Sequence, residues 1–266
     1  VSDDAGLHWK MESGLTNGAQ KIYIDPSSPK ENRTIYVAGS TGIAQKTNGV
    51  WGKNRIPKGV ARLTTCSGGY DPKLKKVIIY AISGNSYFNT DGDVSGIFYT
   101  ENGGLTWENR QNGLMAFRMD GAGIPEWRTI ATSASHPEVV YVSYNGLQVT
   151  KDTTCIGVAK SDDYGKTWKL VWKDLLTKNA QFPSANFSKD WLNERFGPTW
   201  GENPFSIGVS PTDPAICLAT DFGRAIKTSN GGKTWQQVYS KNVNGSAWTS
   251  IGLEVTTGYS VVFDPF

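Results

Sequence analysis

The chain repeats, with small changes, the stretch Lys160-Ser161-Asp162-Asp163-Tyr164-Gly165-Lys166-Thr167-Trp168. The shared pattern is Ser/Thr-x-Asp/Asn-x-Gly-x-Thr-Trp, with His8 in the threonine place of the first copy and a shortened copy at 46–51. Each copy ends in a tryptophan: Trp9, Trp51, Trp107, Trp168 and Trp235. An internal repeat of this kind decides the architecture, because equivalent copies occupy equivalent places in the fold.

The motif is typical of a tight hairpin turn. The oxygens of Ser161 and Asp163 can return to the amides of their own turn, and Gly165 permits a backbone angle closed to other residues. Thr167 and Trp168 suit re-entry into a strand, where the indole offers a large apolar face to a neighbouring sheet. We therefore interpret the motif as a structural turn before an outer strand.

Length, charge and cysteine spacing narrow the class of protein. At 266 residues, the chain is expected to form a single repeat domain over 1–266. The net charge is +3 and the longest basic run is only 73–76, so no nucleic-acid partner is expected. No apolar span is long enough to predict a membrane-crossing helix. Cys66, Cys155 and Cys217 form no zinc pattern, and their pairing stays open.

The spacing of the motif predicts a β-propeller. The tryptophans are 42, 56, 61 and 67 residues apart, and a four-stranded propeller blade takes about 40–50 residues. The predicted inner strands are 21–26, 129–132, 206–211 and 260–265, and the predicted second strands are 34–38, 77–81, 139–143 and 215–219. The third strand of each unit runs into the motif and the fourth begins at its tryptophan. We expect an all-β fold of four complete blades and one blade split between the chain ends, within a larger ring of about seven blades. The alternative is that the chain ends meet and close a small ring.

The motif copies, with Gly14-Leu15 and Gly113-Leu114 following two of them, resemble the Asp-box (BNR repeat) propellers. Among these the chain is most similar to the xyloglucanase-type polysaccharide-degrading propellers, and less similar to sortilin-like receptors and assembly-factor propellers. The resemblance implies that ligands bind on the face away from the boxes. The sialidase pattern is not met, since Arg55-Ile56-Pro57 follows a shortened box. The segment that precedes the catalytic aspartates of the xyloglucanase-type enzymes is also not found.

The longest expected loops share the face opposite the motif turns, as expected for a binding face. Between blades they are 53–60, 110–127, 174–204 and 240–257, and within blades they are 82–95, 144–157 and 219–224. Aromatic rings with interspersed carboxylates suit sugar rings, because the apolar sugar face stacks and the carboxylates accept from hydroxyls. The candidate substrate-binding residues are Trp200, Trp127, Arg128, Arg224, Trp191 and Tyr87.

A glycoside hydrolase needs two carboxyl groups across the bond that it cleaves. The candidate catalytic residues are Glu202, Asp221 and Glu126. Each of these residues also has a purely structural explanation. Trp191 and Trp200 can pack a long loop, Arg128 can form a salt bridge to a neighbouring blade, and Asp221 can cap a turn. His8 and His136 lie on the wrong face to supply a catalytic base, which for a lyase leaves Tyr87 or Tyr144.

The sequence predicts an extracellular carbohydrate-active propeller, a glycoside hydrolase acting on plant or algal polysaccharide. The alternatives are a non-catalytic glycan- or protein-binding propeller and a polysaccharide lyase. The expected partners are a polysaccharide or oligosaccharide and the remainder of the chain's own ring, and the expected location is secreted, periplasmic or at the cell surface. No cofactor is expected, although Asn89, Asp91 and Asp93 have the alternating oxygens of a calcium loop.

Overall fold

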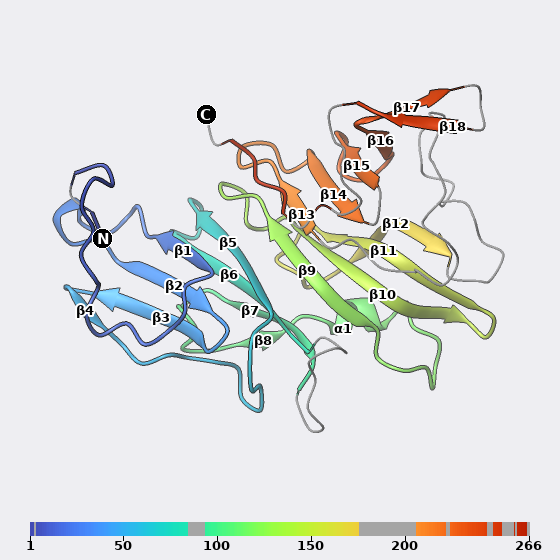
Figure 1. The fold of residues 1–266 in the computed structure, drawn as a ribbon. Helices are drawn as coiled ribbons and strands as arrows, with labels where there is room; N and C mark the ends of the chain where they lie inside the picture. The colour runs from blue at the N-terminus through green and yellow to red at the C-terminus, as the bar shows by residue number, and fades with distance from the viewer. Residues whose placement is uncertain are drawn as a thin grey trace.

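The computed structural model of the chain describes residues 1–2, 4–84, 94–175, 206–221, 224–243, 247–251, 258 and 260–264. Four antiparallel sheets of four strands each follow one another along the chain (Figure 1). The first holds β1 (Lys21–Ile24), β2 (Ile35–Gly39), β3 (Gly42–Thr47) and β4 (Val50–Trp51). The second holds β5 (Thr65–Asp71), β6 (Lys76–Ser83), β7 (Gly96–Thr100) and β8 (Glu108–Asn109).

The third sheet holds β9 (Glu126–Thr132), β10 (Val140–Thr150), β11 (Thr153–Ser161) and β12 (Lys169–Leu175). The fourth holds β13 (Ser206–Val209), β14 (Cys217–Asp221), β15 (Arg224–Thr228) and β16 (Gln236–Val238). A two-stranded hairpin, β17 (Ser240–Val243) and β18 (Ala247–Ser250), follows. Helical structure in the described ranges is limited to η1 (Lys30–Asn32) and α1 (Asn112–Met115). This is the predicted all-β fold of four-stranded propeller blades.

Each sheet runs from an inner to an outer strand in chain order, and the inner strands lie side by side. The strand β9 lies between β5 and β13, and β1 lies beside β5 (Figure 1). The inner strands at 21–24, 129–132 and 206–209 and all four second strands were predicted from sequence. Within the described part of the chain, no helix is long and apolar enough to cross a membrane.

Apolar side chains from successive sheets form the core. Strand β10 illustrates the pattern, because Val140 and Val142 pack in the cluster shared with the second sheet, while Tyr141 packs in the cluster shared with the fourth. Alternate side chains of a strand point to opposite faces of its sheet. A middle blade therefore buries both faces, and burying one large apolar side chain contributes about 1.5–3 kcal/mol.

The repeated motif forms a hydrogen-bonded turn between the third and fourth strands of a sheet. In the third sheet the Ser161 hydroxyl donates to Asp163 Oδ1 (2.7 Å) and the Gly165 amide donates to Ser161 Oγ (2.8 Å). The amide and the hydroxyl of Thr167 both donate to the Asp163 carboxylate, at 2.8 and 2.6 Å. Tyr164 and Gly165 have φ of 62° and 79°, the left-handed region that the glycine was expected to permit.

The copies at 100–107 and 228–235 form the same turn with asparagine in the acid's place. Asn102 Nδ2 donates to Thr106 Oγ1 (2.7 Å), and the Thr106 amide donates to Asn102 Oδ1 (3.0 Å). Asn230 and Thr234 repeat both bonds at 2.8 and 3.0 Å. The turn thus needs a short side chain with one acceptor for the amide and a second group that pairs with the threonine hydroxyl.

The indoles of three motif copies, Trp51, Trp168 and Trp235, form a hydrogen bond to the preceding unit. Trp168 Nε1 donates to the Arg110 carbonyl and Trp235 Nε1 donates to the Val171 carbonyl, both at 2.9 Å. Arg110 and Val171 each lie three residues after the preceding motif tryptophan. Trp51 follows the same spacing, since its indole donates to Glu12 Oε1 at 3.1 Å. Trp107 is an exception, with a buried indole N–H that has no partner.

Sequence reasoning missed the inner strand β5. Its residues, 65–71, include Gly68 and Gly69 and lack the branched alternation of the other strands. A Cβ on Gly69 would lie 2.3 Å from the Ala134 carbonyl oxygen, and the neighbouring Tyr70 amide donates to that oxygen at 3.0 Å. Glycine is therefore required by the close approach of two backbones, which is a recognised reason for glycine inside a strand.

Four predicted boundaries are wrong. The predicted loop 219–224 lies mostly within β14 and β15, and the predicted loop 240–257 contains the hairpin of β17 and β18. The predicted loop 144–157 lies within β10 and β11, which pair as far as Thr150 and Thr153; buried Leu147 and Cys155 stabilise this longer hairpin. The predicted inner strand 260–265 has no assigned strand in its described part, 260–264. That segment contacts β13 through a bond from the Val261 amide to Ser206 Oγ at 3.0 Å.

Replacement of Asp163 tests the account of the motif turn. Asp163→Ala removes the acceptor of three turn bonds and is expected to lower the free energy of unfolding by about 1–2 kcal/mol. Asp163→Asn is expected to cost less than half as much, because Asn102 and Asn230 make the same turn. Denaturant unfolding measures both changes, and equal losses in the two variants would contradict this account.

The Asp163 carboxyl also makes the stability of the fold depend on pH. Burial alone would raise the pKa of the Asp163 carboxyl, but bonds from Thr167, Ser161 and the turn amides outweigh it and lower that pKa. A lowered carboxyl pKa contributes stability that is present above the ordinary pKa, near 3.8, and is lost as the pH falls through the folded value. Asp163→Asn is expected to flatten the acid side of the stability curve, measured by thermal unfolding in acid buffers.

Two tryptophan variants test the contact between blades. Trp168 is 5% exposed and bonded to the preceding blade, whereas Trp9 is 74% exposed and donates to Gly6 of its own turn. Trp168→Phe leaves the Arg110 carbonyl without its indole donor and is expected to cost about 1–3 kcal/mol of unfolding free energy. Trp9→Phe, the matched control, is expected to change it by under about 0.5 kcal/mol. Similar losses in both would show that the bond between blades is not what matters.

Candidate functional site

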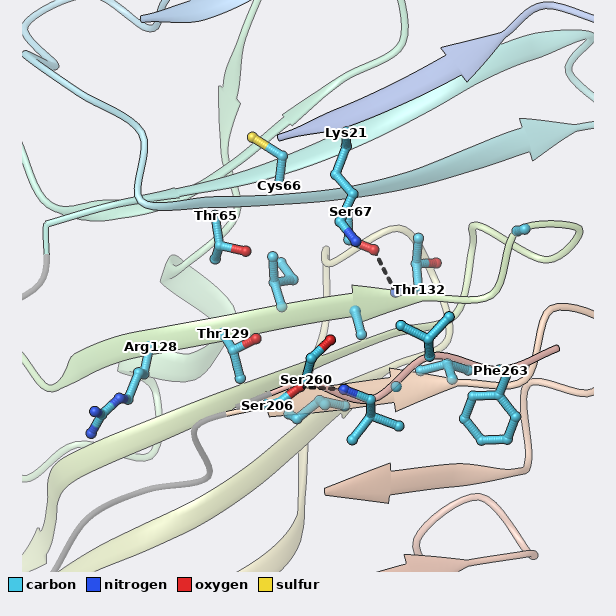
Figure 2. A pocket seen from close by; sticks show the side chains of 18 of the residues that line it. Lys21, Thr65, Cys66, Ser67, Arg128, Thr129, Thr132, Ser206, Ser260 and Phe263 are labelled. Atoms are coloured by element: carbon cyan, nitrogen blue, oxygen red, sulfur yellow. Dashed lines mark hydrogen bonds between the residues drawn. The ribbon is translucent and has the colours of Figure 1, made fainter. Parts of the chain in front are cut away.

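A cavity of about 800 Å³ lies where the inner strands of the four sheets meet (Figure 2). Its walls come from β1, β5, β9 and β13 and from the segments 62–64 and 260–263. Each inner strand is the edge strand of its sheet, and the cavity wall combines hydroxyl side chains such as Thr65 and Thr129 with apolar ones such as Ile207 and Phe263. The volume falls in the range typical of small-molecule sites.

Backbone-to-hydroxyl bonds hold the cavity walls together. The Thr132 amide on β9 donates to Ser67 Oγ on β5 at 3.0 Å, which joins the second and third sheets (Figure 2). Ser206 on β13 accepts from the Val261 amide in the same way. These bonds fix neighbouring inner strands relative to one another, so the wall residues are positioned by the scaffold and not by loops.

The charged residues of the described cavity wall are all basic. They are Lys21, Arg62 and Arg128, and no aspartate or glutamate of the described residues lines the cavity. Lys21 extends from β1 towards Ser67, while Arg128 and Thr129 lie at the other end of the view (Figure 2). Charges of one sign in a cleft focus their field on the space between them. The charged side chains on the described surface of the cavity are therefore of one sign.

The thiol in the cavity wall is not a nucleophile at neutral pH. Burial raises the pKa of Cys66 to about 12, and the nearby ammonium of Lys21 only partly opposes this effect. Since the thiolate is the reactive form, Cys66 is inert near neutral pH. Cys155 and Cys217 are also buried, and the structure joins none of the three cysteines in a disulfide.

Three predicted site residues start β9. Glu126 is half-buried and its Oε2 accepts from Asn145 Nδ2 at 3.5 Å. Arg128, two residues further on and therefore on the same face of the strand, lines the cavity. Trp127 points the opposite way, is fully buried, and donates from its indole to Gln111 Oε1 at 3.1 Å. Trp127 thus offers no exposed ring face here and instead anchors the strand that carries Glu126 and Arg128.

Asp221 and Arg224 lie opposite each other at one end of the fourth sheet. They are the last residue of β14 and the first of β15, and they are paired partners in the ladder. The structure describes their backbone and not their side chains. Their roles, like those of Glu126 and Arg128, stay predictions.

The other predicted site residues lie outside the described residues. They are Glu202, Trp200, Trp191 and Tyr87, together with Asn89, Asp91 and Asp93 of the expected calcium loop. Tyr144, a candidate base for a lyase, is described: it is buried, and its hydroxyl donates to the Trp172 carbonyl at 2.9 Å. Among the described residues, no group of histidine, cysteine, aspartate and glutamate is arranged to hold a metal ion.

Sequence reasoning did not single out Lys21, Thr65 or Thr129, which line the cavity. Lys21 was taken only as part of an inner strand, and Thr65 belongs to the strand that was missed. A usable signal exists, because the inner strands carry hydroxyl and basic residues where the second strands carry apolar ones.

A second hollow, of about 590 Å³, lies beside the motif turn of the fourth sheet. It is lined by Lys160, Lys169, Lys173 and Lys233 and by one carboxylate, that of Asp162. Asp162 pairs with Lys160 at 2.6 Å and lies 3.8 Å from Lys169, so this hollow is basic with one described carboxylate. The central cavity has no such described carboxylate.

Comparison with known proteins gives no family assignment. No protein-family model matches the chain, and no curated protein matches it. Among solved structures, the chain is similar to an ancestral GH74 enzyme, with a TM-score of 0.48 and 14% identity over 84% of this chain and 24% of that one. It is also similar to the Niastella koreensis GH74 enzyme, with a TM-score of 0.31 and 15% identity over 83% of this chain and 38% of that one. The chain thus spans about a quarter and about two fifths of the lengths of these enzymes.

Proposed function

We propose that the chain is a carbohydrate-active propeller, a glycoside hydrolase acting on plant or algal polysaccharide outside the cell. The observation that carries the proposal is the polar cavity of about 800 Å³ at the meeting point of the inner strands. The cavity lies away from the motif turns. The resemblance to Asp-box propellers implies that ligands bind away from those turns. Hydroxyl and cationic side chains on a rigid wall suit a ligand rich in hydroxyl groups.

Glu126 is the described candidate for one of the two carboxyl groups, since it shares a strand face with Arg128 of the cavity wall. In the proposed mechanism Glu202 pairs with either Glu126 or Asp221, one group acting as acid and the other as base or nucleophile. Trp200, Trp191, Tyr87 and Arg224 are proposed to contact sugar units. Calcium at Asn89, Asp91 and Asp93 remains a weaker proposal.

The alternative function is glycan or protein binding without turnover. It is favoured by the composition of the described cavity wall, which contains basic and hydroxyl groups but no described carboxylate. A lyase is a third alternative, and it would release an unsaturated sugar that absorbs ultraviolet light. The burial of Tyr144 leaves a lyase with fewer candidate bases among the described residues.

We also propose that these blades belong to a ring of about seven. Support comes from the exposure of the motif tryptophans. Trp168 and Trp235 pack against the preceding blade and are 5% and 1% exposed, whereas Trp9 is 74% exposed. An equivalent preceding blade would cover Trp9. A structure of the intact protein that carries this chain would count the blades, and a ring of four would contradict the proposal.

Carboxylate variants test the proposed hydrolase. Release of reducing ends from a panel of plant and algal polysaccharides identifies a substrate. On that substrate, Glu126→Gln, Asp221→Asn and Glu202→Gln are assayed separately, and loss of an essential acid or base is expected to slow turnover by about 10²–10⁴-fold. Substrate binding is expected to survive these changes, because the amides retain the shape of the carboxyl groups.

The control is Glu31→Gln, an exposed carboxylate in η1, which is expected to leave turnover unchanged. Binding without any reducing-end release, with affinity lost in Trp200→Ala, would replace the hydrolase with a binding module. An ultraviolet-absorbing product would replace it with a lyase. If no polysaccharide of the panel is bound or cleaved, the carbohydrate proposal fails.

A further inference from the structure

Lys21 is an uncompensated charge in the cavity wall. It lies at the start of β1, its side chain is directed into the cavity (Figure 2), and it forms no ion pair with any residue that the structure describes. Its ammonium is close enough to the buried Cys66 to affect that thiol. Lys21 is exposed, so a ligand in the cavity can reach its ammonium.

Two hydroxyl groups elsewhere in the same cavity wall are also uncommitted. Thr65 on β5 and Thr129 on β9 line the cavity, and neither side-chain hydroxyl has a hydrogen-bond partner among the described residues. The hydroxyls of Ser67 and Ser206, by contrast, accept bonds from backbone amides. The cavity wall therefore contains two kinds of hydroxyl group. Those of Ser67 and Ser206 bond to backbone amides of neighbouring segments, whereas those of Thr65 and Thr129 are available to a ligand.

We propose that Lys21, with Thr65 and Thr129, forms an oxyanion subsite in the central cavity that selects sugar units bearing a carboxylate or a sulfate group. An ammonium and hydroxyl donors are the groups that bind such oxyanions most strongly, through charge-assisted hydrogen bonds. Arg62 and Arg128 add the same sign of charge to the described wall. A neutral sugar would leave the charge of Lys21 without a counter-charge among the described residues of the cavity.

This inference rests on the proposed function, since it names the class of glycan that the proposed site takes. The carboxylate of a uronic acid and the sulfate ester of a sulfated sugar are both oxyanions of this kind, and the geometry favours neither. The basic hollow beside the motif turn offers an internal comparison, because Lys233 lines it without facing the central cavity.

The test is titration calorimetry of the full chain with two pairs of probes. One pair is an oligogalacturonate and its methyl ester, and the other is a carrageenan oligosaccharide and its desulfated form. At least one charged probe is expected to bind with a Kd about tenfold or more below that of its neutral counterpart. Added salt is expected to reduce that difference.

Three variants locate the effect. Lys21→Gln is expected to remove most of the preference for the charged probe, and Lys21→Arg, which keeps the charge, is expected to retain it. Lys233→Gln, in the hollow on the other side of the blade, is the matched control and is expected to behave as the unchanged chain. Because Lys21 makes no described side-chain bond, Lys21→Gln is expected to fold normally, which circular dichroism checks.

Three outcomes would overturn the subsite: equal affinity for charged and neutral probes, an unchanged preference in Lys21→Gln, or an equal loss in Lys233→Gln. Reducing-end release measured on the same preparation separates this inference from the proposed function. Turnover of neutral polymers with no charge preference would overturn the subsite alone. Charge-selective binding that depends on Lys21, without turnover of any polymer, would support the subsite and overturn the hydrolase.

Discussion

The packing of one blade against the next is the interaction on which the whole structure depends. A single four-stranded sheet cannot bury both of its faces, and each apolar cluster of the core therefore joins residues of two successive sheets. The motif turn supports this packing by directing an indole at the preceding blade, as Trp168 and Trp235 do. Because the turn is closed by its own hydrogen bonds, it positions the indole without help from a ligand or a metal ion.

The same arrangement explains where chemistry can occur. With the motif turns committed to packing, the inner strands are left with an edge that faces the central cavity. That edge carries hydroxyl and basic side chains, some holding neighbouring strands together and others uncommitted. A scaffold of this kind is rigid where it recognises a ligand, and the specificity of the proposed site then depends on a few wall residues. Trp127 connects core packing with the proposed site, since its side chain is buried in the core while the next residue on β9, Arg128, lines the cavity.

Much of the fold could be predicted from the sequence, because the motif recurs and each copy ends in a tryptophan. The second strands followed from branched alternation, as at 77–81 and 139–143. Strand β5 could not be found in this way, since the need for Gly69 arises from the Ala134 carbonyl of another blade. The length of the hairpin at 140–161 depends on burial of Leu147 and Cys155, which is a property of tertiary packing. The site was harder to predict. Arg128, which was singled out from the sequence, lines the cavity. Lys21 and Thr65 were not singled out, because their position in the cavity wall depends on the packing of four inner strands.

The central claim is that recognition occurs at the inner strands and not at the motif turns. Hydrogen–deuterium exchange of the chain, with and without a saturating oligosaccharide that it binds, tests this claim most directly. The account predicts added protection at 65–67, 128–132 and 206–209, with the turns at 161–168 and 228–235 unchanged. Protection confined to those turns, with the inner strands unaffected, would contradict it.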